Sequence, residues 1–134
     1  MSQSANLELV PVVRAPRAAR AFVAETLAAW DIQAEEVEAL QLVVSELVTN
    51  AVLHAPKSRR IGVELFWDEN GVRVNVSDES SNEPTRRGPD QSLPEEGRGV
   101  QLVDAIADRW GTERRGWDGK TVWCEVRTKA ATGR

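Results

Sequence analysis

The sequence is poor in cysteine and histidine: its 134 residues contain one of each, Cys124 and His54, and no tyrosine. A single cysteine excludes an internal disulfide and any zinc site built from several cysteines. Cys124 lies in a stretch of alternating apolar residues, which is typical of a small core residue in a strand and not of a catalytic thiol.

The chain also lacks a long apolar run and an excess of basic residues. No stretch approaches the roughly 20 apolar residues of a membrane-spanning helix, and the first residues show no basic segment followed by an apolar one. A formal net charge of -4 argues against nucleic acid or an anionic membrane as the main partner. We therefore expect a cytoplasmic protein that binds neither nucleic acid nor membrane.

What is present is an ordinary globular composition, with 41% hydrophobic and 28% charged residues. A chain of 134 residues suits one core, so we expect a single domain over residues 1–134. Apolar periodicity predicts, in order, a strand 7–13, helices 17–30 and 34–55, strands 60–67 and 72–78, an aperiodic loop 79–98, a helix 99–107, and strands 110–114 and 121–127. Residues 1–6 are expected to be frayed.

Two hairpin signals determine the expected fold class. Asp68-Glu69-Asn70-Gly71 and Gly116-Trp117-Asp118-Gly119 each separate two predicted strands, so these strands are expected to pair antiparallel. Because strands do not alternate with helices, a doubly wound parallel sheet is disfavoured. The sequence predicts an α+β fold, a two-layer sandwich with helices packed on one face of a mixed, mostly antiparallel sheet.

The helix predicted over residues 34–55 carries a polar stripe made of Glu46, Asn50 and His54. Residues four apart differ by only about 40° around a helix, so these side chains share one side of it. The neighbouring face is expected to be core and consists of Leu40, Val43, Val44, Leu47 and Ala51. Apolar residues elsewhere, including Leu42 and Leu53, predict that little of this helix faces water. A buried carboxylate and amide require a partner, and a metal ion and a structural hydrogen-bond network suit them equally well.

Three further positions have both a functional and an ordinary interpretation. Gly97-Arg98-Gly99, where the long loop meets a helix, is suited to phosphate, although such a pair of glycines is more often only a turn. Asp78, at a strand end, can accept the exocyclic amine of adenine or simply form a turn. Thr121 can add a hydroxyl to such a pocket or be an ordinary strand residue.

The order of these motifs resembles the GHKL ATPases, with their Bergerat nucleotide-binding fold. Glu46-x-x-x-Asn50 followed by His54-Ala55 is similar to the N box of that superfamily, and Val76-Ser77-Asp78 to the entry of its first glycine box. The other two matches are Gly97-Arg98-Gly99-Val100-x-Leu102-Val103 with the second glycine box and Gly119-Lys120-Thr121-Val122-Trp123 with the closing strand. The resemblance covers residues 7–127.

Within the superfamily, the small size resembles the stand-alone anti-sigma factors that are also serine kinases. This resemblance implies ATP and Mg²⁺ as ligands, a STAS-domain anti-anti-sigma factor as the phosphorylated partner, and a sigma factor that is captured or released. Relatives of this kind often form homodimers. The implied roles are Glu46 as the base, Asn50 on Mg²⁺, Asp78 on adenine, Gly97 and Gly99 on phosphate, Thr121 supporting the adenine pocket, and residues 83–96 as a lid over ATP. Arg98, between the two glycines, can reach a phosphate oxygen by charge-assisted pairing, although an arginine at such a position more often faces solvent.

One departure from the superfamily pattern keeps a second function open. The first glycine box is usually Asp-x-Gly-x-Gly, whereas Asp78-Glu79-Ser80-Ser81-Asn82 has no glycine. The alternative is therefore an ATP-binding switch that holds a signalling partner without catalysis. The catalytic half of a sensor histidine kinase is disfavoured, because the chain has one histidine and no dimerising helical hairpin.

Overall fold

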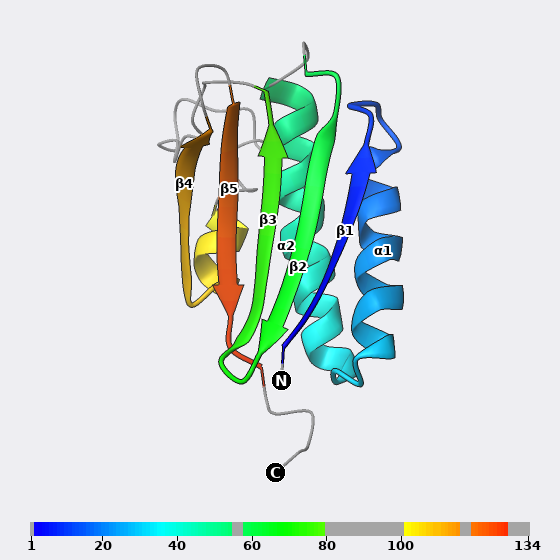
Figure 1. Ribbon diagram of the computed structural model, residues 1–134, viewed down its shortest axis with the longest axis vertical. Coiled ribbons are helices and arrows are strands. Elements are labelled where there is room, and N and C mark those ends of the chain that lie inside the picture. Colours follow the sequence, from blue (N-terminus) through cyan, green and yellow to red (C-terminus); the bar gives the residue numbers. More distant parts are fainter. Residues whose placement is uncertain (1, 55–57, 80–100, 116–118, 129–134) are drawn as a thin grey trace.

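The computed structural model describes residues 2–54, 58–79, 101–115 and 119–128. In these residues the helices and strands follow in the order β1 (Gln3–Leu9), α1 (Ala15–Ala29), α2 (Ala34–His54), β2 (Ile61–Asp68), β3 (Gly71–Asp78), β4 (Arg109–Arg115) and β5 (Gly119–Val126). Residues 101–106 add a short helix before β4, drawn in yellow in Figure 1. The strands form one five-stranded sheet in the order β1-β2-β3-β5-β4.

The sheet is antiparallel at each of its four described pairings. The α+β sandwich predicted from the sequence is confirmed, but the expected mixed sheet is antiparallel throughout the described strands. The tight turn from β2 into β3 requires the glycine at position 71. Its φ is 135°, and a Cβ at this position would collide with the carbonyl oxygen of Val126. This backbone conformation is one that side-chain-bearing residues rarely adopt.

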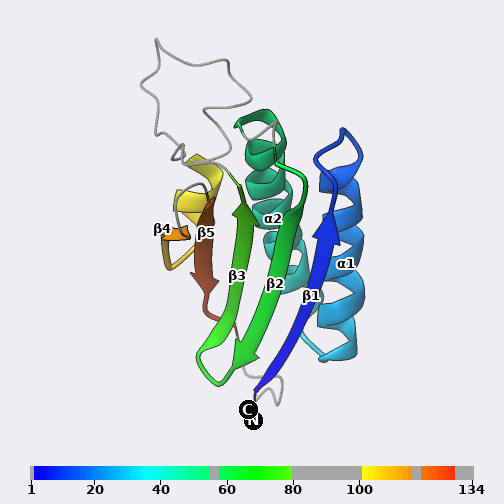
Figure 2. The ribbon, with the colours of Figure 1, turned by 45° about the horizontal axis from the view of Figure 1, so that its top comes forward.

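Both long helices cover the same face of the sheet. Figures 1 and 2 show α1 and α2 side by side behind the strands, with α2 behind the middle of the sheet. Strand alternation sends every second side chain toward them, and the buried members include Ile61, Val63, Leu65, Val72, Val74, Val76, Val122, Cys124 and Val126. Cys124 is fully buried, as predicted for a small core residue, and burial raises the pKa of its thiol to about 12.

The core face predicted for α2 is confirmed: Leu40, Val43, Val44, Leu47 and Ala51 are all buried. The expectation that little of this helix faces water is wrong. Leu42 and Leu53 are 40% and 48% exposed, because α2 packs on the sheet through one face and the opposite face has no second layer over it among the described residues. Within these residues, no helix is long and apolar enough to cross a membrane.

The first strand differs most from the prediction. It was expected over residues 7–13 after a frayed start, but β1 spans Gln3–Leu9 and pairs with β2 from Gln3↔Trp67 to Leu9↔Ile61. Pairing with β2 satisfies the backbone of this polar stretch, and an edge strand tolerates polar side chains that face water. The strand ends before Pro11, which cannot donate a backbone hydrogen bond to the ladder.

Candidate functional site

A small pocket lies where the C-terminal end of α2 meets β3 and β5. These three ends lie together at the upper end of the molecule in Figure 1. The pocket lining consists of Leu47, Asn50, Ala51 and His54 from α2, Val76 and Asp78 from β3, and Lys120 and Val122 from β5. Helical spacing brings the four α2 residues to one side, and strand alternation turns the four strand residues toward them. The structure thus brings Asn50 and His54, which belong to one predicted motif, together with Asp78, which belongs to another.

The polar centre of this pocket is an ion pair between Asp78 and Lys120. The Nζ atom of Lys120 donates to both carboxylate oxygens of Asp78, at 2.8 and 3.1 Å. The two side chains are only 6% and 3% exposed. Their Cα atoms are partners in the register of β3 and β5, so the sheet itself holds the two residues opposite each other.

Two hydrogen bonds connect the end of β3 to the segment that precedes β2. The backbone N–H of Glu79 donates to Ser58 Oγ at 2.8 Å, and the Glu79 carboxylate accepts from the backbone N–H of Arg59 at 2.7 Å. Ser58 is buried. These two bonds tie the residue after Asp78 to the segment before β2, and they help to keep the Asp78 carboxylate directed into the pocket.

Glu46 lies one helical turn before Asn50 and does not line the pocket. Burial raises the pKa of its carboxyl above the ordinary value, and the nearby Arg20 guanidinium partly opposes that rise. Arg20 belongs to α1 and donates to Ser45 Oγ at 2.8 Å, which brings its positive charge beside this part of α2. The sequence analysis did not identify Arg20, because its role depends on how α1 packs against α2.

Asn50 is half-buried and contributes the amide of the polar stripe to the pocket. No group of three or more histidine, cysteine or acidic side chains among the described residues is arranged to hold a metal ion. One amide oxygen at the pocket suits Mg²⁺, since Mg²⁺ commonly takes one or two protein ligands and completes its shell with phosphates and water. The donor set therefore fits a magnesium ion that arrives with a nucleotide.

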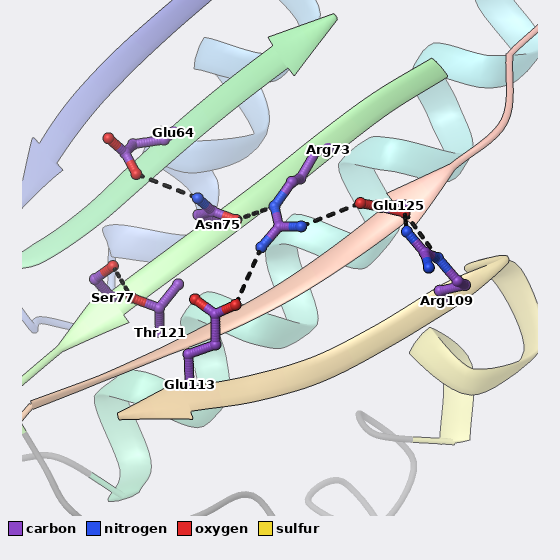
Figure 3. Close-up of polar contacts among 8 residues, drawn as sticks. All are labelled: Glu64, Arg73, Asn75, Ser77, Arg109, Glu113, Thr121 and Glu125. Carbon is purple, nitrogen blue, oxygen red and sulfur yellow. Dashed lines mark hydrogen bonds and ion pairs between the residues drawn. The ribbon is translucent and has the colours of Figure 1, made fainter. Parts of the chain in front are cut away.

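Thr121 does not line the pocket. Its hydroxyl forms a hydrogen bond of 2.8 Å with Ser77 Oγ (Figure 3), and neither residue belongs to the pocket lining. The physical reason is strand parity: in β5 the side chains that point to the helices are Lys120, Val122 and Cys124, and Thr121 points the other way. The contribution of Thr121 to an adenine pocket stays a prediction, whereas Lys120 holds the position on β5 that faces this pocket.

The sequence contained a sign of this arrangement that the motif comparison passed over. Lys120 shares its parity with Val122, Cys124 and Val126, and a lysine in phase with a buried apolar series needs a partner of opposite charge. Asp78, at the end of β3 and in phase with Val74 and Val76, is likewise a charged residue at the end of a buried apolar series.

Figure 3 also shows that the sheet face away from the helices carries its own polar network. Arg73 donates to Asn75 at 3.0 Å and to Glu125 at 3.1 Å, and Glu125 also accepts from Arg109. These bonds lower the pKa of the Glu125 carboxyl, with Arg109 as the main cause. Arg73 lies 4.5 Å above the Trp123 ring. Arg73 and Arg109 are thus paired within the sheet.

The remaining predicted site residues cannot be placed. Gly97, Arg98 and Gly99, together with the lid predicted over residues 83–96, lie outside the described residues.

Comparison with known proteins identifies the family. A sequence model described as the histidine kinase-like ATPase domain matches residues 11–125. An uncharacterized protein of Streptomyces coelicolor is 36% identical over 99 residues, which cover 66% of this chain and 93% of that protein. An anti-sigma F factor of Priestia megaterium is 26% identical over 136 residues, which cover 92% of this chain and 91% of that protein.

A solved structure supports the fold. The crystal structure of the RsbU and RsbW domains of a Mycobacterium tuberculosis protein matches 94% of this chain with a TM-score of 0.68 and 20% sequence identity. The chain spans 32% of the length of that longer protein. Taken with the motifs and the pocket, these matches lead to one conclusion: the chain belongs to the histidine kinase-like ATPase family, and within the GHKL superfamily it resembles the anti-sigma and serine-kinase branch.

Proposed function

We propose that this protein is an ATP- and Mg²⁺-dependent serine/threonine kinase that acts as an anti-sigma factor and phosphorylates a STAS-domain anti-anti-sigma partner. The observation that carries the proposal is that Asn50 of α2 and Asp78 of β3 line one pocket. The similarity to an anti-sigma F factor over 92% of this chain supports the regulatory role.

Each pocket residue has a chemical task in this proposal. The Asp78 carboxylate accepts a hydrogen bond from the exocyclic amine of adenine, which guanine does not offer at that position. The Asn50 amide oxygen would hold Mg²⁺, which would neutralise negative charge on the phosphate oxygens. Gly97, Arg98 and Gly99 stay as predicted phosphate contacts, suited by close backbone approach and by charge-assisted hydrogen bonding.

Glu46 is the proposed general base. The partner's hydroxyl oxygen forms a bond to the γ-phosphorus while the bond from that phosphorus to the β–γ bridging oxygen breaks, and the electron pair leaves with ADP. Glu46 takes the hydroxyl proton. Its raised pKa suits this task, because a carboxylate with a higher pKa is a stronger base.

The test measures transfer of a labelled γ-phosphate from Mg-ATP to candidate STAS-domain proteins. We expect Glu46→Ala to lower the rate of phosphate transfer by about 100-fold or more, as for loss of a general base, while ATP binding persists. Glu38→Ala is the matched control, because Glu38 is an exposed acidic residue of the same helix. Loss of transfer in both variants, or in neither, contradicts the assigned role of Glu46.

A non-catalytic ATP-binding switch is the second candidate, and a specific observation favours it. Residues 79–82, directly after Asp78, contain no glycine, and Lys120 already occupies the Asp78 carboxylate. A protein of this kind binds Mg-ATP and holds its regulatory partner only while ATP is bound. Tight ATP binding without phosphate transfer to any STAS-domain protein would favour the switch over the kinase.

A further inference from the structure

We infer that Lys120 competes with the nucleotide base for the Asp78 carboxylate, so that Lys120 sets how tightly this protein binds nucleotide. The inference rests on the proposed function, since it takes Asp78 as the residue that receives the base. It adds a determinant of affinity within the chain itself.

The small volume of the pocket is the first observation. The cavity has a volume of about 20 Å³, enough for one water molecule and too small for a purine ring. The Lys120 side chain lines this cavity and bonds to both oxygens of the Asp78 carboxylate. A base can reach that carboxylate only if the lysine side chain moves.

The chemistry of the pair explains why this movement has a cost. Both charges are almost fully buried, so separating them leaves two poorly solvated charges. The amine of adenine is an uncharged donor, and its hydrogen bond to a carboxylate is weaker than that of an ammonium group. Exchange of Lys120 for the base therefore opposes binding, and the phosphate and metal contacts must offset it.

The lysine side chain is able to make this exchange. Its four-carbon stem is flexible and its ammonium group is strongly hydrated, so it can swing toward water or toward an arriving phosphate while its backbone stays in β5. The backbone of Asp78 is held by the sheet register and by the bonds at Glu79, so the carboxylate stays in place. Lys120 is thus the mobile partner.

Calorimetric titration with adenosine and with Mg-ADP tests the inference. Adenosine reports on the base pocket alone, because it carries no phosphate. We expect Lys120→Ala to bind both ligands about tenfold or more tightly than the unmodified protein, because the carboxylate no longer has a charged competitor. Arg60→Ala is the matched control, since it removes a cation from an exposed ion pair with Glu8.

A second variant covers the case in which Lys120→Ala does not fold, which circular dichroism would reveal. Lys120→Met keeps most of the aliphatic stem and removes the ammonium group, and it too should bind adenosine more tightly. Equal or weaker adenosine binding by the folded variants overturns the inference while leaving the proposed function intact. So does a loss of Mg-ADP binding with unchanged adenosine binding, which would make Lys120 a phosphate ligand. If neither the unmodified protein nor any variant binds Mg-ADP, the proposed function fails and the inference fails with it.

Discussion

At the scale of single residues, the site depends on which side of a helix or strand each polar group occupies. Asn50 and His54 reach the pocket because they follow Leu47 at helical spacing, and Asp78 reaches it because it is in phase with Val76. The sequence was sufficient to predict which residues share a face, but not which of them line the pocket, since Glu46 lies on the same polar stripe and does not line it. It was not sufficient to show that Lys120 and Asp78 bond, because that contact depends on the register of β3 against β5.

A test of the metal role follows from the position of Asn50. Asn50→Asp replaces a neutral oxygen ligand with a charged one, so the Mg²⁺ concentration that half-saturates ATP binding should shift, by about tenfold if the oxygen contacts the ion directly. Titration of Mg²⁺ at fixed ATP, followed by calorimetry, measures this shift.

The control for that experiment makes the same chemical change elsewhere. Asn70→Asp alters an exposed residue in the turn between β2 and β3, at the opposite end of β3 from Asp78. Its Mg²⁺ dependence should equal that of the unmodified protein. An unchanged Mg²⁺ dependence in Asn50→Asp would count against a metal ligand at this position.

At the scale of helices and strands, β1 was harder to predict than the other strands. The alternation that predicted strands over residues 60–67 and 72–78 reflects one buried face, and the observed strands, Ile61–Asp68 and Gly71–Asp78, match these bounds within one residue. The alternation in residues 7–13 was misleading, because the pairing of β1 with β2 begins at Gln3 in a polar stretch. In β1, the long-range pairing with β2 therefore overrides the local apolar pattern of the sequence.

The turn at Gly71 gives a prediction about stability. Gly71→Ala places a Cβ at a φ of 135° and against the backbone of Val126 and Arg127, so it should lower the free energy of unfolding by about 1–3 kcal/mol or more. Urea denaturation followed by circular dichroism measures the change.

Gly62 provides the matched control for this turn. A Cβ at Gly62 would meet Ser77 Cβ at 3.9 Å, an ordinary contact, and its φ is outside the positive region. Gly62→Ala should therefore leave stability almost unchanged. A similar loss in both variants would mean that the strain assigned to Gly71 is not the cause.

At the scale of the whole molecule, one core joins both helices to the sheet, and the site lies at one end of it. The core cluster contains side chains from α1, α2 and the inner strands, among them Leu27, Leu40 and Val74. This two-layer arrangement was predictable from the element order. The neighbourhood of Arg20 and Ser45 was not, because it depends on the packing of α1 on α2.

Cys124 reports on this core as a whole. Its thiol is fully buried and its pKa is raised to about 12, so at pH 8 it should be protonated and inaccessible. A thiol reagent should label the native protein only at the rate of unfolding, and labelling should accelerate steeply across the urea transition. Stopped-flow absorbance with a chromogenic disulfide measures the rate. Rapid labelling of the native protein would show that the sheet opens locally near Cys124.

The strand order also gives the sheet two edge strands that differ in charge. Among the described strands, β1 and β4 each have a neighbour on one side only. Free backbone groups on such strands can template the addition of a foreign strand, and charged side chains discourage it. On β4, Arg109, Glu113 and Arg114 supply that protection, whereas β1 between Gln3 and Leu9 carries a single charge, Glu8. Unwanted intermolecular sheet growth is therefore expected to begin at β1.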